Sequence, residues 1–223
     1  MTVELKALDI SRRYMKGNDV SHDIAHVCRV VRNAKKILSL SSEDIRNKVD
    51  IDILVSIAAL HDCLDKKYVV ADAIPAMRAV LINEIVSELG FDLAQADFIL
   101  KTVDNISYST ELLGGEAASS TCAYLAIARD ADRLESIGAI GAARCFAYSA
   151  AKGRLLATES FEIEKALRND NTAPHNDESA ICHFYDKLVH LLPRFRTKPG
   201  REMAEQRHNF ILSFLDQIHS ELD

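Results

Sequence analysis

Apolar residues recur every three or four positions along most of this chain, which is the spacing of amphipathic helices. The clearest stripe lies between residues 23 and 38 and consists of Ile24, Val27, Val30, Val31, Ala34, Ile37 and Leu38. The later segment IDILVSIAALHD is apolar almost all round. We expect it to form a buried central helix that begins after the caps Ser41 and Ser42 and runs to Asp62.

Further stripes predict helices over residues 75–89, 92–106, 119–134, 139–151, 179–192 and 202–222. Gly90 and Gly153 follow two of these segments, where glycine commonly ends a helix. Polar or glycine-rich stretches predict loops at 110–117 and 168–179. Because no repeat or linker divides the chain, the pattern predicts one all-α domain over residues 1–223. It is a helical bundle with a core at about 20–150 and a C-terminal helical extension at about 177–222 packed on it.

Composition narrows the class of protein further. The chain has eight glycines, four prolines and no tryptophan, which favours long helices over a sheet with many tight turns. Its five cysteines form no CxxC pair, so they indicate neither a disulfide framework nor a zinc ribbon. The N-terminus lacks a long apolar stretch, and the net charge is −6. We therefore expect a cytoplasmic protein that binds neither a membrane nor a nucleic acid polymer.

Metal-binding side chains stand at three separate points along these helices. His26 lies beside the apolar stripe of residues 23–38, and the pair His61-Asp62 ends the apolar segment. Asp132 follows the apolar run CAYLAIA. Two imidazoles and two carboxylates suit a divalent ion such as manganese, iron, cobalt, nickel or magnesium. Since neighbouring residues point about 100° apart on a helix, His61 and Asp62 can share one ion only near a helix end.

This order of residues, H…HD…D on helices, resembles the HD superfamily of metal-dependent phosphohydrolases. Four strings carry the resemblance: HDIAHVCRV, ALHDCLDKK, NISYS and DADRLESIGAIG. They are similar in particular to a branch of small bacterial HD proteins associated with nucleotide hydrolysis. The resemblance covers about residues 20–150, and HFYDKL with the basic stretch after it extends it to about residue 215.

The resemblance implies that His26, His61, Asp62 and Asp132 are the metal ligands. A divalent ion held there lowers the pKa of a bound water and polarises a phosphoryl group. Asp65 stands where the alarmone-hydrolase branch has the first residue of an acidic pair, and it is the candidate for orienting or deprotonating the water. The second position of that pair is Lys66, which departs from the alarmone pattern. Asp65 alternatively sits on the surface and pairs with Lys66 or Lys67.

Several polar residues are candidates for contact with the substrate. Lys66 and Lys67 can meet its phosphates as point charges, with Lys66 close to the chemistry. His22 has three open roles: it binds phosphate, joins a second metal, or caps the helix together with Ser21. Asn105 either lines the pocket or caps a helix. The last two candidates are His183 and Lys187, at the start of a basic C-terminal stretch. This stretch either binds the phosphates of the substrate or is an ordinary solvated helix face.

The favoured function is hydrolysis of a phosphoanhydride or phosphoester bond in a small phosphorylated metabolite, namely a nucleotide. One alternative is a cyclic-nucleotide phosphodiesterase, which would need a second metal and further histidines. Another is a domain that binds a nucleotide as a signalling module without turnover. The number of subunits stays open, with a homodimer as the candidate oligomer.

Overall fold

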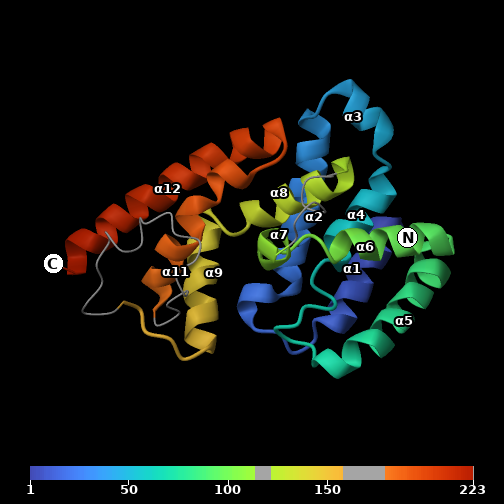
Figure 1. Cartoon of the computed structure of the whole chain (residues 1–223), viewed down its shortest axis with the longest axis horizontal. Helices are drawn as coiled ribbons and strands as arrows, with labels where there is room; N and C mark the ends of the chain where they lie inside the picture. The colour runs from blue at the N-terminus through green and yellow to red at the C-terminus, as the bar shows by residue number, and fades with distance from the viewer. Residues whose placement is uncertain (114–121, 158–178, 223) are drawn as a thin grey trace. The chain divides into compact units, whose positions relative to one another are not determined.

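The computed structural model describes residues 1–113, 122–157 and 179–222, and these residues form helices (Figure 1). Within these ranges the one β-type pairing is an isolated bridge between Leu155 and Ser179. Contacts divide the chain into two compact units: residues 1–18 with 22–132, and residues 19–21 with 133–223. The single folding domain expected from the sequence therefore stays a prediction, and each unit is described by itself.

The first unit contains eight α-helices within its described residues. They are α1 (Val3–Tyr14), α2 (Ile24–Leu40), α3 (Glu43–Lys48), α4 (Ile51–Leu60), α5 (Ile74–Glu84), α6 (Leu93–Val103), α7 (Tyr108–Leu113) and α8 (Ala123–Leu134), the last two residues of α8 belonging to the second unit. A π-helical turn, Ile85–Leu89, continues α5. None of the described helices combines the length and apolar character that a membrane crossing requires.

Helix α4 is the core of the first unit, as its apolar sequence predicts. Every residue from Ile53 to Leu60 is buried, and Leu54, Ile57 and Leu60 have no exposed surface. The helix packs against α1, α2 and α6. Burying one such side chain contributes about 1.5–3 kcal/mol, so this contact network holds the C-terminal end of α4 firmly in place.

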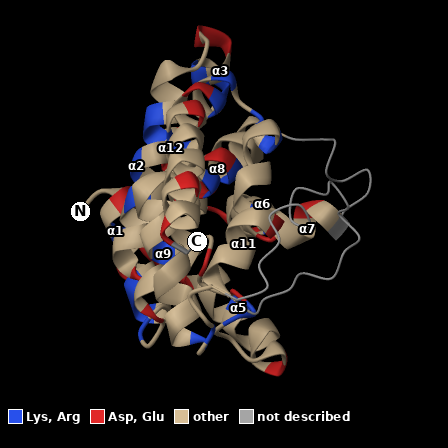
Figure 2. Ribbon diagram, turned by 90° about the vertical axis from the view of Figure 1, so that its left-hand side faces the viewer, with Lys and Arg blue, Asp and Glu red and all other residues tan. Residues whose placement is uncertain are grey.

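The helix predicted to begin after Ser42 and run to Asp62 is wrong in one respect, because the structure breaks it into α3 and α4. Asp50 lies between them with non-helical backbone angles (φ −68°, ψ 122°), and its carboxylate accepts hydrogen bonds from the amides of Asp52 and Ile53. An aspartate that caps a new helix competes with continuation of the old one. Helix α3 buries no residue and carries both acidic and basic side chains (Figure 2).

Other predicted boundaries also shift. The loop expected at 110–117 is helical through Leu113, at the end of α7, and its remainder lies outside the described residues. The helix expected over 179–192 ends at Asp186 and gives way to short 3₁₀ turns. The loop expected at 168–179 lies outside the described residues except for Ser179, which caps α11. Helix α1 has no counterpart among the predicted helices.

Capping residues account for several boundaries that the sequence does predict. The carboxylate of Asp23 accepts a hydrogen bond from the amide of His26 and begins α2. Gly90 follows the π-helical turn at φ +84°, a left-handed conformation that glycine adopts without a Cβ clash. Asp92 and Gln95 form a capping box at the start of α6. These local signals, read with the apolar stripes, explain why the predicted helices are present.

The second unit is built from α9 (Gly138–Ala151), α11 (Ala180–Asp186) and α12 (Lys198–Leu222). Helix α9 packs on both α11 and α12. Aromatic rings join the three helices: the Phe146 ring lies 5.6 Å from that of Phe184 and 5.9 Å from that of Phe214, centre to centre. At Gly138, an added Cβ would lie 3.1 Å from the Arg207 side chain, so glycine permits this close approach.

Candidate metal centre

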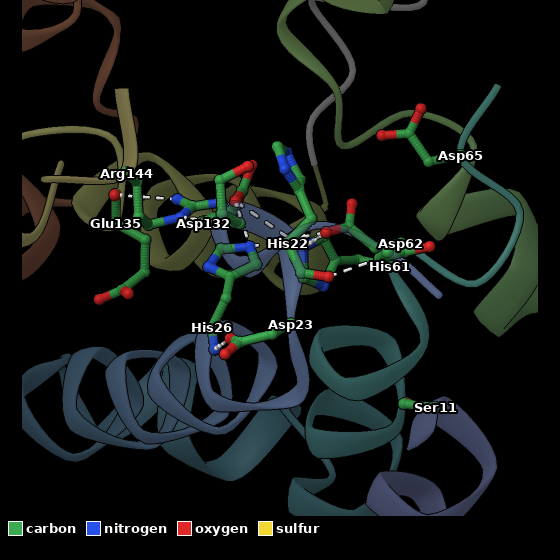
Figure 3. Close-up of polar contacts among 12 residues, drawn as sticks. Ser11, His22, Asp23, His26, His61, Asp62, Asp65, Asp132, Glu135 and Arg144 are labelled. Carbon is green, nitrogen blue, oxygen red and sulfur yellow. Dashed lines mark hydrogen bonds and ion pairs between the residues drawn. The ribbon is translucent and has the colours of Figure 1, made fainter. Parts of the chain in front are cut away.

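Three helices of the first unit bring together the side chains that the sequence pattern singles out (Figure 3). His26 projects from the first turn of α2, and Asp132 projects from the last turn of α8. His61 is the C-cap residue of α4, and Asp62 follows it. The adjacent pair therefore occupies a helix end, where two consecutive side chains can face one centre.

The donor atoms of three of these residues lie within ion-binding distance of one another, and Asp132 approaches the two histidines. Nitrogen and oxygen atoms of His26, His61 and Asp62 all lie within 4.8 Å of one another. The Nε2 atoms of His26 and His61 lie 3.6 and 3.2 Å from Asp62 Oδ2. The same two nitrogens lie 3.6 and 3.7 Å from Asp132 Oδ1.

These separations fit a shared divalent cation. Ligands at about 2.1 Å from an ion stand about 3 Å apart at a right angle and about 4.2 Å apart across the ion. The observed distances of 3.2 to 3.7 Å fall between those limits. The cluster of donor atoms is thus close to the size that first-row metal coordination requires.

Two polar atoms of the cluster make no hydrogen bond among the described residues, as a metal site requires of its ligand atoms. His61 Nδ1 lies 2.8 Å from the Ala58 carbonyl oxygen, so this nitrogen carries the hydrogen in the neutral ring and Nε2 keeps its lone pair. Both His61 Nε2 and Asp62 Oδ2 are buried, and within the described part of the chain neither makes a hydrogen bond. Buried polar atoms without partners cost free energy that a bound cation recovers.

Electrostatics in the metal-free cluster point the same way. Burial disfavours the protonated His61 ring, but the negative charges of Asp62 and Asp132 outweigh burial and raise the pKa of His61 to about 9. Burial likewise disfavours the charged form of Asp62, yet His61, His26 and His22 hold its pKa well below its usual range. Asp62 therefore stays ionised beside the imidazoles. A divalent cation is favoured at such a site, where it can replace the proton of His61.

His22 lies beside this cluster. Its ring centre is 6.0 Å from that of His26 in an edge-to-face arrangement. Its Nδ1 is 3.0 Å from the Tyr68 hydroxyl. The helix cap that the sequence offered as one role for His22 and Ser21 is made by Asp23 instead.

Asp65 is not brought into the cluster. Its carboxylate accepts a hydrogen bond from the Lys67 amide and lies 3.4 Å from Lys67 Nζ. In Figure 3 it stands apart from the two histidines and the aspartates Asp62 and Asp132. Lys66 is exposed on the same loop. The pairing of Asp65 with Lys67 matches the surface interpretation, while the role of Asp65 in moving a proton stays a prediction.

Asn105 closes the end of α6. Its side-chain amide donates a hydrogen bond to the backbone carbonyl of Lys101. The backbone carbonyl of Asn105 accepts two hydrogen bonds from the Arg129 guanidinium. Arg129 is almost fully buried, and its Nη1 lies 3.8 Å from the buried carboxylate of Glu111. Asn105 therefore makes the helix-capping contact that the sequence offered as its alternative, and contact with a substrate stays a prediction.

The remaining substrate candidates, His183 and Lys187, lie on and directly after α11 in the second unit. Part of the basic stretch that follows them has structural partners there. Arg133 donates to the Arg194 carbonyl, and Arg207 donates to the Leu134 carbonyl and lies 3.7 Å from Glu135. Arg207 therefore has contacts within the second unit. A substrate role for His183 and Lys187 stays a prediction.

Sequence reasoning missed Tyr68, the residue that contacts His22. The two residues are 46 positions apart, and no periodic pattern connects a histidine before one helix with a tyrosine in a loop. It also missed Arg144, whose guanidinium donates to the carbonyl of Glu135 (Figure 3). The same guanidinium donates to the carbonyl of Ser21. None of these contacts has a spacing signal in the sequence.

No protein-family model matches the chain. The chain is 30% identical to the uncharacterized protein YpgQ of Bacillus subtilis. The alignment is 227 positions long, gaps included, and covers 98% of this chain and 95% of YpgQ. The crystal structure of Bacillus subtilis YpgQ in complex with ADP is similar to it, with a TM-score of 0.68 and 26% identity, covering 97% of this chain and all of that one. An HD-superfamily hydrolase from Bacillus thuringiensis superposes with a TM-score of 0.67 at 25% identity, covering 98% and 95% of the two chains. These similarities confirm the all-α HD-type fold.

Proposed function

We propose that this chain, which belongs to the family of Bacillus subtilis YpgQ within the HD superfamily, is a metal-dependent phosphohydrolase that acts on a small nucleotide. The proposal is more specific than membership in a superfamily of hydrolases. It assigns the metal to His26, His61, Asp62 and Asp132.

The observation that carries the proposal is the approach of the two imidazole Nε2 atoms to within 3.2–3.7 Å of the two carboxylates. Two of their donor atoms, His61 Nε2 and Asp62 Oδ2, are buried and make no hydrogen bond within the described residues. A purely structural cluster of this kind would pair its polar atoms with neighbouring donors and acceptors. A nitrogen and oxygen set suits Mn²⁺, Fe²⁺, Co²⁺, Ni²⁺ or Mg²⁺.

A divalent ion at this centre supplies two effects that hydrolysis needs: it lowers the pKa of a bound water and polarises a phosphoryl oxygen. The chain supplies orientation. The Ala58 carbonyl holds the His61 ring with Nε2 toward the centre, and Asp23 fixes the first turn of α2 that carries His26. The Asp132 side chain is 28% exposed, so solvent reaches the cluster. Asp65 remains the proposed acceptor of the proton from the attacking water.

A nucleotide is the proposed substrate because the related YpgQ was crystallised with ADP. Its phosphates would meet Lys66 and Lys67 on the loop after Asp62 and His22 beside the cluster. Both lysine side chains are exposed, and Lys67 would exchange its ion pair with Asp65 for a contact with the bound anion. Asn105, His183 and Lys187 stay candidates for contacts with the rest of the substrate.

The test is a product panel with defined metals. Metal-free protein is loaded with each divalent ion in turn and incubated with nucleoside mono-, di- and triphosphates and with cyclic nucleotides. We expect release of phosphate or pyrophosphate from a non-cyclic nucleotide, in proportion to metal content. Linear products from cyclic nucleotides would instead identify a phosphodiesterase. Tight nucleotide binding without any product would overturn the proposal in favour of a non-catalytic binding module.

A further inference from the structure

The loop after Asp62 is folded so that it presents one tyrosine hydroxyl to the rim of the cluster. The Asp65 carbonyl accepts hydrogen bonds from the amides of Tyr68 and Val69, both at 3.0 Å. The Asp65 carboxylate accepts a third from the amide of Lys67 at 2.9 Å. These three bonds define the turn over residues 65–69. Tyr68 therefore leaves the turn in a fixed direction.

His22 receives this tyrosine. The Tyr68 hydroxyl is 3.0 Å from His22 Nδ1, and the two rings lie 5.4 Å apart, centre to centre. The backbone of His22 is held as well, because the Asn18 side chain donates to its carbonyl oxygen at 3.3 Å. Both Tyr68 and His22 are half-buried. His22 is thus fixed at its ring and at its backbone, next to His26.

The contact between Tyr68 and His22 is not the cap of α2. His22 precedes the cap of α2, and that helix is already capped by Asp23. Tyr68 lies in a loop whose turn is closed by Asp65. A hydrogen bond between two half-buried rings at the edge of a metal cluster instead restricts how the histidine can face a ligand.

We propose that Tyr68 is a positioning residue that donates its hydroxyl hydrogen to His22 Nδ1, so that His22 Nε2 carries a hydrogen and binds a substrate phosphate oxygen beside the metal cluster. This inference rests on the proposed phosphohydrolase function and deepens it. A neutral imidazole has one donor and one acceptor nitrogen, so a donor at Nδ1 assigns the hydrogen to Nε2. A donor at Nε2 is what a phosphate oxygen, an acceptor, requires. Holding the ring before binding also removes the entropy cost of ordering it.

The first test reads the ring directly in metal-free protein. Nitrogen chemical shifts of the His22 side chain should show the Nε2–H tautomer in the unaltered protein. In Tyr68→Phe, which keeps the ring and removes the hydroxyl, they should show a mixture of tautomers. A matched control is Tyr124→Phe, because the Tyr124 hydroxyl accepts a hydrogen bond from the Asp50 amide at the other end of α4. That variant should leave the His22 signals unchanged. An unchanged tautomer in Tyr68→Phe would overturn the proposal.

The second test is a double-mutant cycle on binding of ADP to the metal-loaded protein, measured by calorimetry. Loss of one positioning hydrogen bond should weaken ADP binding about fivefold in Tyr68→Phe. In a His22→Ala background, Tyr68→Phe should have no further effect, because Tyr68 acts only through His22. An equal effect in both backgrounds, or none in either, would overturn the proposal. The denaturation midpoints of Tyr68→Phe and Tyr124→Phe should fall by similar amounts, which separates positioning from loss of stability.

Failure of this inference differs from failure of the proposed function. If ADP binds and the nucleotide panel yields product while Tyr68→Phe changes neither the tautomer nor the affinity, the positioning role alone is wrong. If the unaltered protein neither binds nor hydrolyses any nucleotide, the proposed function is wrong and the phosphate contact fails with it. The tautomer result then still decides whether Tyr68 sets the ring of His22.

Discussion

The two ends of α4 are built for different purposes. Before its first turn, the Asp50 carboxylate accepts hydrogen bonds from the amides of Asp52 and Ile53, and the Asp50 amide donates to the Tyr124 hydroxyl at 2.7 Å. At its last turn, His61 Nε2 and Asp62 Oδ2 are buried without hydrogen bonds within the described residues. The N-terminal end of α4 is capped by hydrogen bonds within the protein. The C-terminal end has ligand atoms that make no hydrogen bond within the described residues.

The difference between the two ends indicates that the N-terminal end of α4 serves stability and that the C-terminal end serves metal binding. Both ends belong to the same helix, whose buried middle packs on α1, α2 and α6. The packing holds the helix, so its C-terminal end can keep buried polar atoms without hydrogen bonds at a local cost in free energy. Changes at the two ends should therefore have opposite consequences for stability and metal binding.

The largest expected effect comes from Asp62→Ala. Removing the carboxylate nearest to both imidazoles should abolish metal uptake and hydrolysis, because its Oδ2 lies 3.2 and 3.6 Å from the two ring nitrogens. The protein should stay folded, since water can fill the vacated space. Metal content is measured by elemental analysis and folding by circular dichroism. Hydrolysis at the original rate would remove Asp62 from the site.

Asp65→Asn should have the next largest effect. If Asp65 accepts the proton of the attacking water, turnover should fall roughly 10²–10⁴-fold while metal content is unchanged. The amide oxygen can still accept from the Lys67 amide, so the turn over residues 65–69 should persist. Single-turnover kinetics measure the chemical step. Turnover equal to that of the unaltered protein would leave Asp65 with its role in the turn alone.

The pH dependence of metal binding sharpens the contrast at the functional end. His61 has a pKa of about 9 in the metal-free protein, so an incoming ion must displace its proton at neutral pH. Apparent metal affinity should rise about 50-fold from pH 7 to pH 9, nearly tenfold between pH 7 and pH 8 and about fivefold between pH 8 and pH 9, where half of the rings are already neutral. Calorimetry in buffers of different ionisation enthalpy should detect the released proton. Affinity independent of pH over this range would contradict a protonated His61.

The same shifts set the stability of the metal-free protein. The pKa of His61 is raised on folding, so its stabilising effect is complete below about pH 6.5 and is lost as the pH rises to about 9. The pKa of Asp62 is lowered, so its contribution is present above about pH 4 and is lost in acid. The free energy of unfolding of the metal-free protein should therefore be largest between about pH 4 and pH 6.5. Saturating metal should remove the decline on the alkaline side.

The smallest expected effect lies at the other end of the helix. Asp50→Ala should lower the free energy of unfolding by about 1 kcal/mol, because two amides lose their cap. Asp50→Asn, which retains a capping oxygen, is the matched control and should be close to neutral. Metal affinity should stay the same in both variants. A loss of metal binding in Asp50→Ala would show that the two ends are not independent.

The helices that define the site were predictable because their signals are local. The apolar stripe of α2, the largely apolar α4 and the placement of His61-Asp62 at a helix end all follow from periodicity and side-chain chemistry. The break at Asp50 was missed, because an aspartate within a helical stretch becomes a cap only when tertiary packing starts a new helix there. Helix α1 was missed too: it buries only Ala7, Ile10 and Ser11, a narrow and partly polar stripe.

The polar contacts around the site were the least predictable part. Tyr68 and His22 meet across 46 residues, and the Asn105 carbonyl meets Arg129 across 24. Such contacts depend on how helices pack, which periodicity does not report. The structure brings His26, His61, Asp62 and Asp132 together, while their service as ligands and the roles of the substrate candidates stay predictions.

The most direct measurement is the anomalous diffraction of a crystal of the protein soaked in Mn²⁺. We expect one strong peak about 2.0–2.3 Å from His26 Nε2, His61 Nε2, Asp62 Oδ2 and Asp132 Oδ1, the range for nitrogen and oxygen ligands of such ions. A peak bound elsewhere on the chain, or no peak under conditions in which the protein hydrolyses its substrate, would contradict the account.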